Sequence, residues 1–479
     1  MAPFLISAIP TPLAAYPPPA ETLWGTLAAR LQLDPLNGVA SAIFALAILH
    51  TFVTSRFAAR AHRVQRRHEE RLLAAGRPVR PSVRAELLHF LGEVEVVFGL
   101  WAVVLLVALV AARGWDQAGR YLDHGVDFTE PLFVVVVMAL ASTRPIVALA
   151  EAVLQRIASL GGGRPVAWWL TILTVGPLLG SFITEPAAMT ICALLLGRRV
   201  FDLGPSARFR YATLGLLFVN VSIGGTLTHF AAPPVLMVAR SWGWTTLSMM
   251  RLFGWRALVA IVVSNAVYLF LFRRELRELA LRPVPKEVDL PEQGPDGRFA
   301  PPLPVPGWVT LVHVLFMAWT VFTAHHPVLF VGGFLFFLGF ARASAPYQGR
   351  IDLRAPLLVG FFLGGLVVHG GLQGWWIAPM LASLPQVPLF AAALALTAFN
   401  DNALVTHLAT LVPGLGETMK VAVVGGAIAG GGLTVIANAP NPAGQALLSR
   451  YFGGSVSPLG LLRGAVLPTV IAVCAFRLL

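Results

Sequence analysis

Apolar runs of about the length that crosses a lipid bilayer recur along most of this chain. A transmembrane helix needs ~20 mostly apolar residues, and a soluble domain carries about 25% charged residues. Here only 12% of the 479 residues are charged and 57% are hydrophobic, which leaves too few charges to cover a surface in water. We therefore predict an all-α polytopic membrane protein, with apolar segments near 37–55, 88–112, 131–154, 166–182, 187–197, 209–240, 253–272, 307–324, 327–341, 355–369, 386–399, 402–412, 418–450 and 458–477.

The order of these segments repeats. Each half of the chain has three spans, a pair of short runs, a broken segment and one more span. A short run cannot cross a bilayer, so each pair predicts a re-entrant hairpin. We expect an N-terminal segment (1–36), a first membrane repeat (37–272, with hairpin 166–197 and broken helix 209–240), a proline-rich cytoplasmic linker (273–306), and a second membrane repeat (307–479, with hairpin 386–412 and broken helix 418–450).

Sequence similarity between the halves supports this repeat. The stretch TEPAAMT (184–190) aligns with NDNALVT (400–406), which pairs Glu185 with Asp401 and Thr190 with Thr406. The stretch GGTLTHFAAPP (224–234) aligns with GGGLTVIANAP (430–440). Two motifs that recur in the same order indicate an internal duplication.

The distribution of lysine and arginine predicts opposite orientations for the two halves. Nine arginines lie in 56–84, so this segment should be cytoplasmic. Arginines flank both ends of the first hairpin, whereas no lysine or arginine occurs between Arg354 and Lys420. The first hairpin should therefore enter from the cytoplasm and the second from outside, which is the inverted repeat of many secondary transporters.

The net charge of +12 does not predict a nucleic-acid partner, because the basic residues lie in short segments between apolar runs. Cys192 and Cys474 lie in separate apolar segments, and their spacing predicts neither a disulfide nor a metal site.

Glu185 and Asp401 are the expected centre of the functional site, at the hairpin tips near mid-membrane. A charge there costs ~2.5–3.5 kcal/mol on insertion scales, and neither the tips nor the glycine-rich breaks contain a lysine or arginine. A proton or a metal cation would then neutralise each carboxylate. The alternative is that both acids only cap the helix that follows, since acids favour that position and proline favours the first turn.

The glycine-rich breaks would supply the rest of the site. Glycine frees the backbone and proline prevents a continuous helix, and unwound carbonyls suit a small hard cation. The alternative is close helix packing through small residues. The candidate cation-binding residues are Thr184, Thr190, Gly225, Thr226, Thr228, Asn400, Asn402, Thr406, Gly431, Thr434, Asn438 and Asn441.

Three further polar residues fall in or beside apolar segments. His229 and His369 could relay protons or form structural hydrogen bonds. Arg144 lies within the predicted span 131–154 and should pair with an acidic residue such as Glu93 or Glu95.

The hairpin tips SFITEPAAMT and FNDNALV and the two glycine-rich breaks resemble those of the ion transporter superfamily, from about residue 88 to the end. The acidic tips are most similar to the D-type bacterial Na+/H+ antiporters, and the nearest resemblance is to the family labelled "putative Na+/H+ antiporter". Glu185 with Pro186 replaces the Asp-Asn expected there, and HFAAPP lacks the usual Ile-Gly.

The resemblance implies a secondary active transporter of the bacterial cytoplasmic (inner) membrane. It would exchange Na+ (or Li+ or K+) for H+ by an elevator-like motion, as a homodimer in the lipid bilayer and without a cofactor. The alternative is a sodium-coupled symporter of a small anion or metabolite. An enzyme is not expected, since neither H-E-x-x-H nor G-x-S-x-G occurs.

Overall fold

The computed structural model describes residues 9–282, 292–293, 299–300, 303–349, 351 and 353–479. The described chain is helical apart from one short antiparallel strand pair in the linker, β1 (Glu292–Gln293) and β2 (Phe299–Ala300). The helices before the linker are α1 (Leu23–Leu33), α2 (Leu36–Thr51), α3 (Thr54–Ala74), α4 (Val83–Leu91), α5 (Val94–Arg113), α6 (Trp115–Arg120), α7 (Thr129–Ala141), α8 (Arg144–Leu160), α9 (Pro165–Ile183), α10 (Glu185–Arg199), α11 (Ala207–Gly224), α12 (Pro233–Trp242), α13 (Thr246–Met249), α14 (Trp255–Leu271) and α15 (Arg273–Leu279).

The second half repeats the order of a hairpin, a broken helix and a last long helix. Its helices are α16 (Gly307–Phe322), α17 (Pro327–Ala343), α18 (Arg354–Gly370), α19 (Gly374–Ala382), α20 (Gln386–Phe399), α21 (Asn402–Thr410), α22 (Glu417–Gly430), α23 (Asn441–Leu448) and α24 (Pro458–Leu478).

Several helices are long and apolar enough to cross a membrane, which confirms the prediction of a multi-pass membrane protein. Four runs in the described chain qualify alone: α5, α9, the run Thr246–Leu271 and α24. Three further pairs of helices qualify when each pair is counted as one bent span, which gives up to seven candidate spans. The pairs are α1 with α2, the α6 region with α7, and α18 with α19, and the bends between their helices are 110°, 58° and 81°.

Some predicted boundaries and lengths were wrong. The first arm of the first hairpin, predicted to be too short to cross a bilayer, is the 19-residue helix α9, which is long and apolar enough to span. The expected span 131–154 is two helices, because α7 ends at Ala141 and α8 begins at Arg144 with Pro145 in its first turn, where proline is tolerated. Arg144 therefore lies at a helix start, and its Nη2 donates to the carbonyl of Leu303 at 2.8 Å. The segment 88–112 also breaks, between α4 and α5, and α1 and α19 lie outside the predicted apolar runs.

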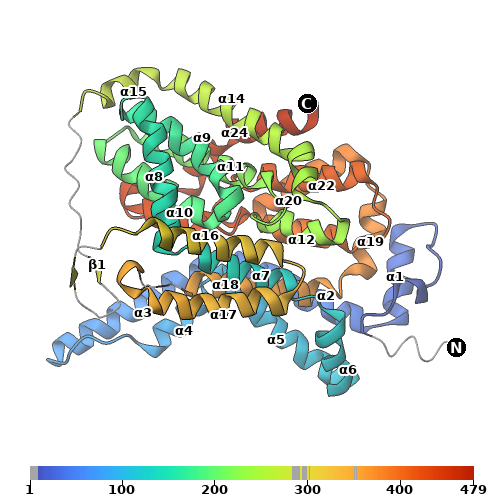
Figure 1. Cartoon of the computed structure of the whole chain (residues 1–479). Coiled ribbons are helices and arrows are strands. Elements are labelled where there is room, and N and C mark those ends of the chain that lie inside the picture. The colour runs from blue at the N-terminus through green and yellow to red at the C-terminus, as the bar shows by residue number, and fades with distance from the viewer. Residues whose placement is uncertain (1–8, 283–291, 294–298, 301–302, 350, 352) are drawn as a thin grey trace. The chain divides into compact units, whose positions relative to one another are not determined.

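Contacts divide the chain into two compact units, and each draws on both halves of the sequence. The first unit comprises 1–131, 357–383 and 411–413, and the second comprises 132–356, 384–410 and 414–479. The second unit contains both predicted hairpins and both broken helices. In its core α9, α11, α14 and α24 pack side by side (Figure 1), around fully buried aromatic side chains such as Trp169, Phe209 and Phe218.

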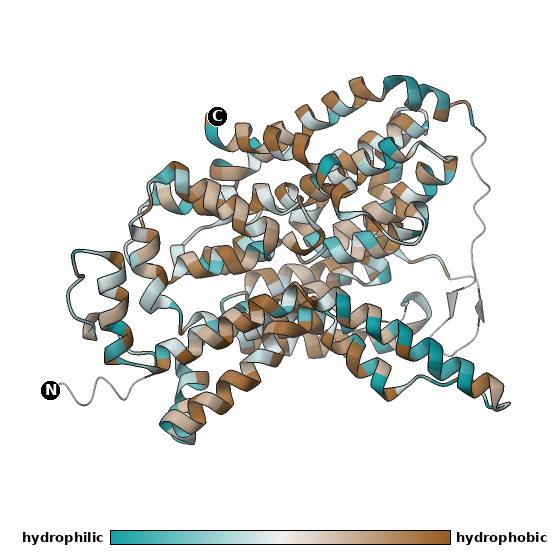
Figure 2. Cartoon of the chain, turned by 180° about the vertical axis from the view of Figure 1, so that it is seen from behind, coloured by the Kyte–Doolittle hydropathy of each residue, from teal (hydrophilic) through white to brown (hydrophobic). Residues whose placement is uncertain are grey.

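Helix α3, in the first unit, differs from its neighbours in composition. Figure 2 shows it as a largely hydrophilic helix among apolar ones. It holds most of the arginines of the basic segment 56–84. A helix this polar is unsuited to the interior of a bilayer.

Prolines inside three helices are compensated by side chains. A proline cannot donate to the carbonyl four residues earlier, so it leaves that carbonyl without its helical partner. Helices α9, α19 and α24 contain Pro177, Pro379 and Pro468. In α9 the freed carbonyl of Leu173 accepts from the side-chain amides of Asn220 and Asn265, at 2.8 and 3.0 Å. In α19 the carbonyl of Trp375 accepts from Arg30 at 2.6 Å, and in α24 the carbonyl of Gly464 accepts from the Tyr268 hydroxyl at 2.7 Å.

Candidate functional site

The first hairpin turns through a single residue under backbone strain. Helices α9 and α10 pack against each other and are joined by Thr184 alone. Thr184 has φ 76°, and it is the one non-glycine residue with positive φ in the described chain. A residue held in such a region costs of order 1–3 kcal/mol, and such residues cluster at functional sites. The Thr184 hydroxyl is also buried without a hydrogen-bond partner.

Glu185 follows as the first residue of α10 and is completely buried. Its Oε2 accepts a hydrogen bond from Nδ2 of Asn438 at 3.0 Å, whereas its Oε1 has no hydrogen-bond partner. No side chain caps the start of α10. The capping alternative is therefore wrong for Glu185, whose carboxylate contacts the second half of the sequence instead.

The first broken helix borders this carboxylate. Between α11 and α12 the chain forms a short 3-10 turn, η4 (Gly225–Leu227). A Cβ atom on Gly225 would lie 2.5 Å from Oε1 of Glu185 and 2.6 Å from its Cγ. Only glycine at this position leaves room for the carboxylate.

A serine on the hairpin holds the break in place. The hydroxyl of Ser181 donates to the carbonyl of Gly224 at 2.7 Å and accepts from the amide of Leu227 at 2.9 Å. Thr228 donates in turn to the Ser181 carbonyl at 2.6 Å. The sequence analysis missed Ser181, because a serine inside a helix carries no distinctive signal.

The second hairpin joins α20 to α21 through Asn400 and Asp401. Oδ1 of Asp401 accepts a hydrogen bond from the backbone amide of Ala403 at 2.8 Å. Asp401 therefore caps the start of α21, as the capping alternative predicted. Asp401 is also buried. The next residue, Asn402, is completely buried, and neither its Oδ1 nor its Nδ2 has a hydrogen-bond partner.

The second broken helix is fixed by its own asparagine and threonine. Nδ2 of Asn441 donates to the carbonyls of Gly431 and Thr434 at 2.7 and 2.9 Å, and the Thr434 hydroxyl donates to Ala398 of α20 at 2.9 Å. These bonds hold the unwound segment between α22 and α23 against the second hairpin.

The two breaks and the second hairpin also meet at Gly431. A Cβ there would lie 2.2 Å from Oγ of Ser222 and 2.9 Å from Nδ2 of Asn402. Ser222, another residue that the sequence analysis missed, lies on α11 and donates to the carbonyl of Ile428 at 2.8 Å.

Five buried side-chain oxygens of these tips and breaks have no hydrogen-bond partner in the described chain. Buried polar groups are nearly always satisfied, so a cluster of unsatisfied acceptors indicates a place suited to a cation or a proton. We refer to these groups as the acceptor cluster: the Thr184 hydroxyl, Oε1 of Glu185, and Oδ1 of Asn402, Asn438 and Asn441.

Other predicted ligands bond within their own helix or turn. The hydroxyls of Thr190 and Thr406 donate to carbonyls one turn earlier, on Pro186 at 2.9 Å and on Asn402 and Ala403 at 3.2 and 3.1 Å. Thr226 donates to Ile223 at 2.6 Å. Each hydroxyl oxygen keeps lone pairs, but its proton is committed to the backbone.

The two predicted histidines belong to different units. Nδ1 of His229 lies 2.8 Å from the Thr246 hydroxyl in the second unit. His369 lies in the first unit, with its ring centroid 5.9 and 6.1 Å from those of Phe44 and Phe98. His407 on α21 is also buried and was not predicted.

No group of three or more His, Cys, Asp or Glu side chains in the described part of the chain could hold a metal ion. The acceptor cluster instead combines the carboxylate of Glu185 with amide and hydroxyl oxygens, which are the ligands of a weakly held hard cation.

A family profile described as "Putative Na+/H+ antiporter" matches residues 35–479, which is most of the chain. The chain belongs to this Na+/H+ antiporter family. Among curated proteins, none matches it. The matched region of this antiporter-family protein includes both hairpins, both breaks and every residue of the acceptor cluster. Its family is one of transporters and not of enzymes.

Proposed function

We propose that this protein exchanges a monovalent cation, Na+ in the first place, for protons across the bacterial cytoplasmic membrane. Glu185 would hold either the proton or the cation. One observation carries the proposal: Glu185 is completely buried, and its Oε1 has no hydrogen-bond donor in the described chain.

The energetics of Glu185 support this assignment. A single neutral amide, that of Asn438, donates to its carboxylate. One such hydrogen bond does not compensate the loss of hydration of a full charge. Neutralisation by a proton or by a cation removes that cost, and the two neutralised states exclude each other.

Asp401 favours a cation in the same place. It is a second buried acid, at the tip of the second hairpin, and two neighbouring carboxylates would disfavour joint ionisation unless a positive charge joined them. The unwound carbonyls of the breaks and the oxygens of Asn438 and Asn441 would complete the coordination. Exchange then follows from competition, with the cation bound when protons are scarce and released when they are abundant.

The alternative, sodium-coupled uptake of a small anion, needs a donor for the anion. None of the oxygens of the acceptor cluster accepts a hydrogen bond from a lysine or arginine in the described chain, and the charged group of the cluster is Glu185. This composition favours a cation as the transported ligand.

We also propose that the two halves form an inverted repeat and that transport is an elevator-like motion of a homodimer. The order of elements supports the repeat: α9–α10, α11–α12 and α14 in the first half correspond to α20–α21, α22–α23 and α24 in the second. The opposite distribution of arginine around the two hairpins supports the inversion.

The experiment that tests the exchange uses purified protein in proteoliposomes with a fluorescent reporter of ΔpH. Na+, Li+ and K+ are added separately after an acid-inside gradient is imposed. We expect at least one of the three to dissipate the gradient in a protein-dependent way. If none does so across pH 6 to 9, the exchange proposal is wrong.

A further inference from the structure

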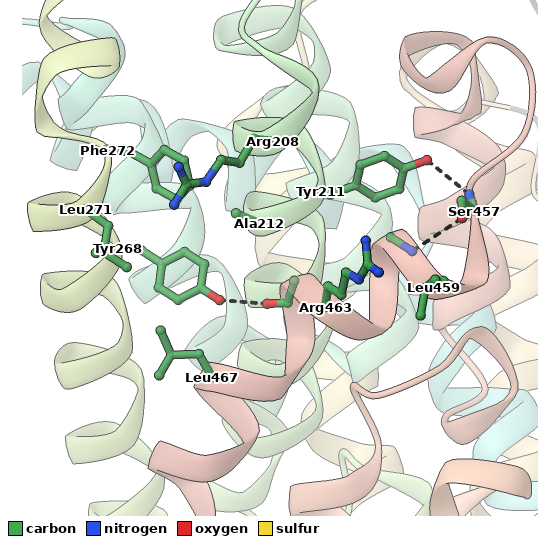
Figure 3. A pocket seen from close by; sticks show the side chains of 12 residues that line it. Arg208, Tyr211, Ala212, Tyr268, Leu271, Phe272, Ser457, Leu459, Arg463 and Leu467 are labelled. Carbon is green, nitrogen blue, oxygen red and sulfur yellow. Dashed lines mark hydrogen bonds between the residues drawn. The ribbon is translucent and has the colours of Figure 1, made fainter.

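A second feature of the structure lies apart from the acceptor cluster. A cavity of about 530 Å³ opens between the first turns of α11 and α24 and the last turn of α14 (Figure 3). Two arginines, Arg208 and Arg463, line it together with aromatic and aliphatic side chains. All of these residues belong to the second unit.

The tyrosines of the cavity are already engaged with the protein. Tyr268 donates to the carbonyl of Gly464 at 2.7 Å, and the Tyr211 hydroxyl accepts from the amide of Ser457 at 3.1 Å (Figure 3). They brace α14 and α11 against the start of α24, so the wall is fixed before any ligand arrives.

The guanidinium groups, in contrast, have no carboxylate partner in the described chain. Arg208 lies over the ring of Phe272, 5.7 Å from its centroid. The nearby Glu275 accepts instead from the amide and hydroxyl of Ser206, at 2.6 and 3.0 Å. Two cations lining one cavity without an anion predict an anionic ligand, and a planar guanidinium matches a phosphate.

The rest of the cavity is apolar and faces outward. Leu271, Leu459 and Leu467 line it and are 52%, 54% and 38% exposed, on two helices that are long and apolar enough to span a membrane. Arg463 follows the start of α24 by five residues, a rise of about 8 Å. The charge of Arg463 therefore lies in the second turn of a candidate membrane span, with apolar surface beside it.

We propose that this cavity binds an anionic phospholipid, with its phosphate between Arg208 and Arg463 and its acyl chains along Leu271 and Leu467. A free phosphate ion shares the headgroup chemistry but would leave the exposed leucines uncovered. Basic pockets between transmembrane helices are known to suit anionic headgroups.

The test is native mass spectrometry of the purified protein with phosphatidylglycerol or phosphatidylcholine added in detergent. A basic residue near a membrane surface contributes about fivefold in affinity, so Arg208→Gln with Arg463→Gln should weaken phosphatidylglycerol binding about twenty-fivefold. Arg208→Lys with Arg463→Lys should retain most of the binding, because the charge remains. Arg251→Gln, at the other end of the α14 run, is the matched control and should bind as the unmodified protein does.

Three results would overturn the proposal. The first is equal binding of phosphatidylcholine and phosphatidylglycerol, and the second is an unchanged affinity in the double glutamine variant. The third is displacement of the lipid by millimolar inorganic phosphate, which would identify a site for a small anion. A melting curve for each variant separates lost binding from lost folding.

Discussion

Gly225→Ala should impair cation binding while leaving the protein folded. The added Cβ would lie 2.5 Å from Oε1 of Glu185, where ordinary contact begins at 3.4 Å, so the carboxylate must retreat by about 0.9 Å. The added Cβ would also lie 2.6 Å from Cγ of Glu185, so the whole side chain must turn, but none of the three atoms nearest to the Cβ belongs to the backbone. The same retreat would break the bond from Asn438, which is 3.0 Å long. A hydrogen bond to a charged group contributes about 1.5–3 kcal/mol, which corresponds to roughly a ten- to hundredfold loss of apparent Na+ affinity.

The assay measures the Na+ concentration that gives half-maximal dissipation of ΔpH in proteoliposomes. Gly332→Ala on α17 is the control, because a Cβ there meets nothing within 4 Å and alanine favours a helix. Size-exclusion profiles and melting temperatures of both variants should resemble those of the unmodified protein. A well-folded Gly225→Ala protein with unchanged half-maximal Na+ would refute the contact between this glycine and a functional Glu185.

Three other outcomes are expected. Asn438→Ala removes the hydrogen-bond donor to Glu185 and should lower the apparent Na+ affinity by about tenfold. The measurement is again the Na+ concentration for half-maximal dissipation of ΔpH, and an unchanged value would exclude Asn438 from the site. Gly464→Ala should yield aggregated protein in size exclusion, because a Cβ on Gly464 would lie 2.1 Å from the backbone oxygen of Tyr211. Gly339→Ala is the control and should not aggregate, because a Cβ there meets nothing within 4 Å. Monodisperse Gly464→Ala protein would contradict the close packing of α11 and α24. A tag in the 274–305 linker should be accessible only from the cytoplasm, and a tag near residue 372 only from outside. Labelling of both tags from the same side would refute the proposed inverted repeat.

Much of the membrane architecture could be predicted because its signals are local. The hairpins and broken helices were located by short apolar runs interrupted by glycine, proline and acidic residues, and α9–α12 and α20–α23 lie where those patterns placed them. The break before Arg144 was not predicted, although Pro145 is typical of a helix start, because the residues on both sides are apolar and read as one continuous span. The short helices α1 and α19 were missed because each falls below the length of a span.

The contacts of the candidate site could not be predicted in the same way. The bond between Glu185 and Asn438 joins residues 253 positions apart, and the sequence identified both without showing that they meet. Ser181 and Ser222 act only through carbonyls that tertiary packing brings to them. The difference between a capping Asp401 and a non-capping Glu185 also depends on the direction of each side chain, which their matching positions in the two aligned motifs did not reveal.

The most direct measurement of the central claim is the number of protons released when Na+ binds. Isothermal titration calorimetry in two buffers of different ionisation enthalpy gives this number for the purified protein. If Glu185 holds either ligand, Na+ should displace about one proton at acidic pH, and Asp401→Asn should weaken binding while keeping the release, since Asn still caps α21. Glu185→Gln should abolish the release. Na+ binding without proton release in the unmodified protein, or the same release from Glu185→Gln, would contradict the account.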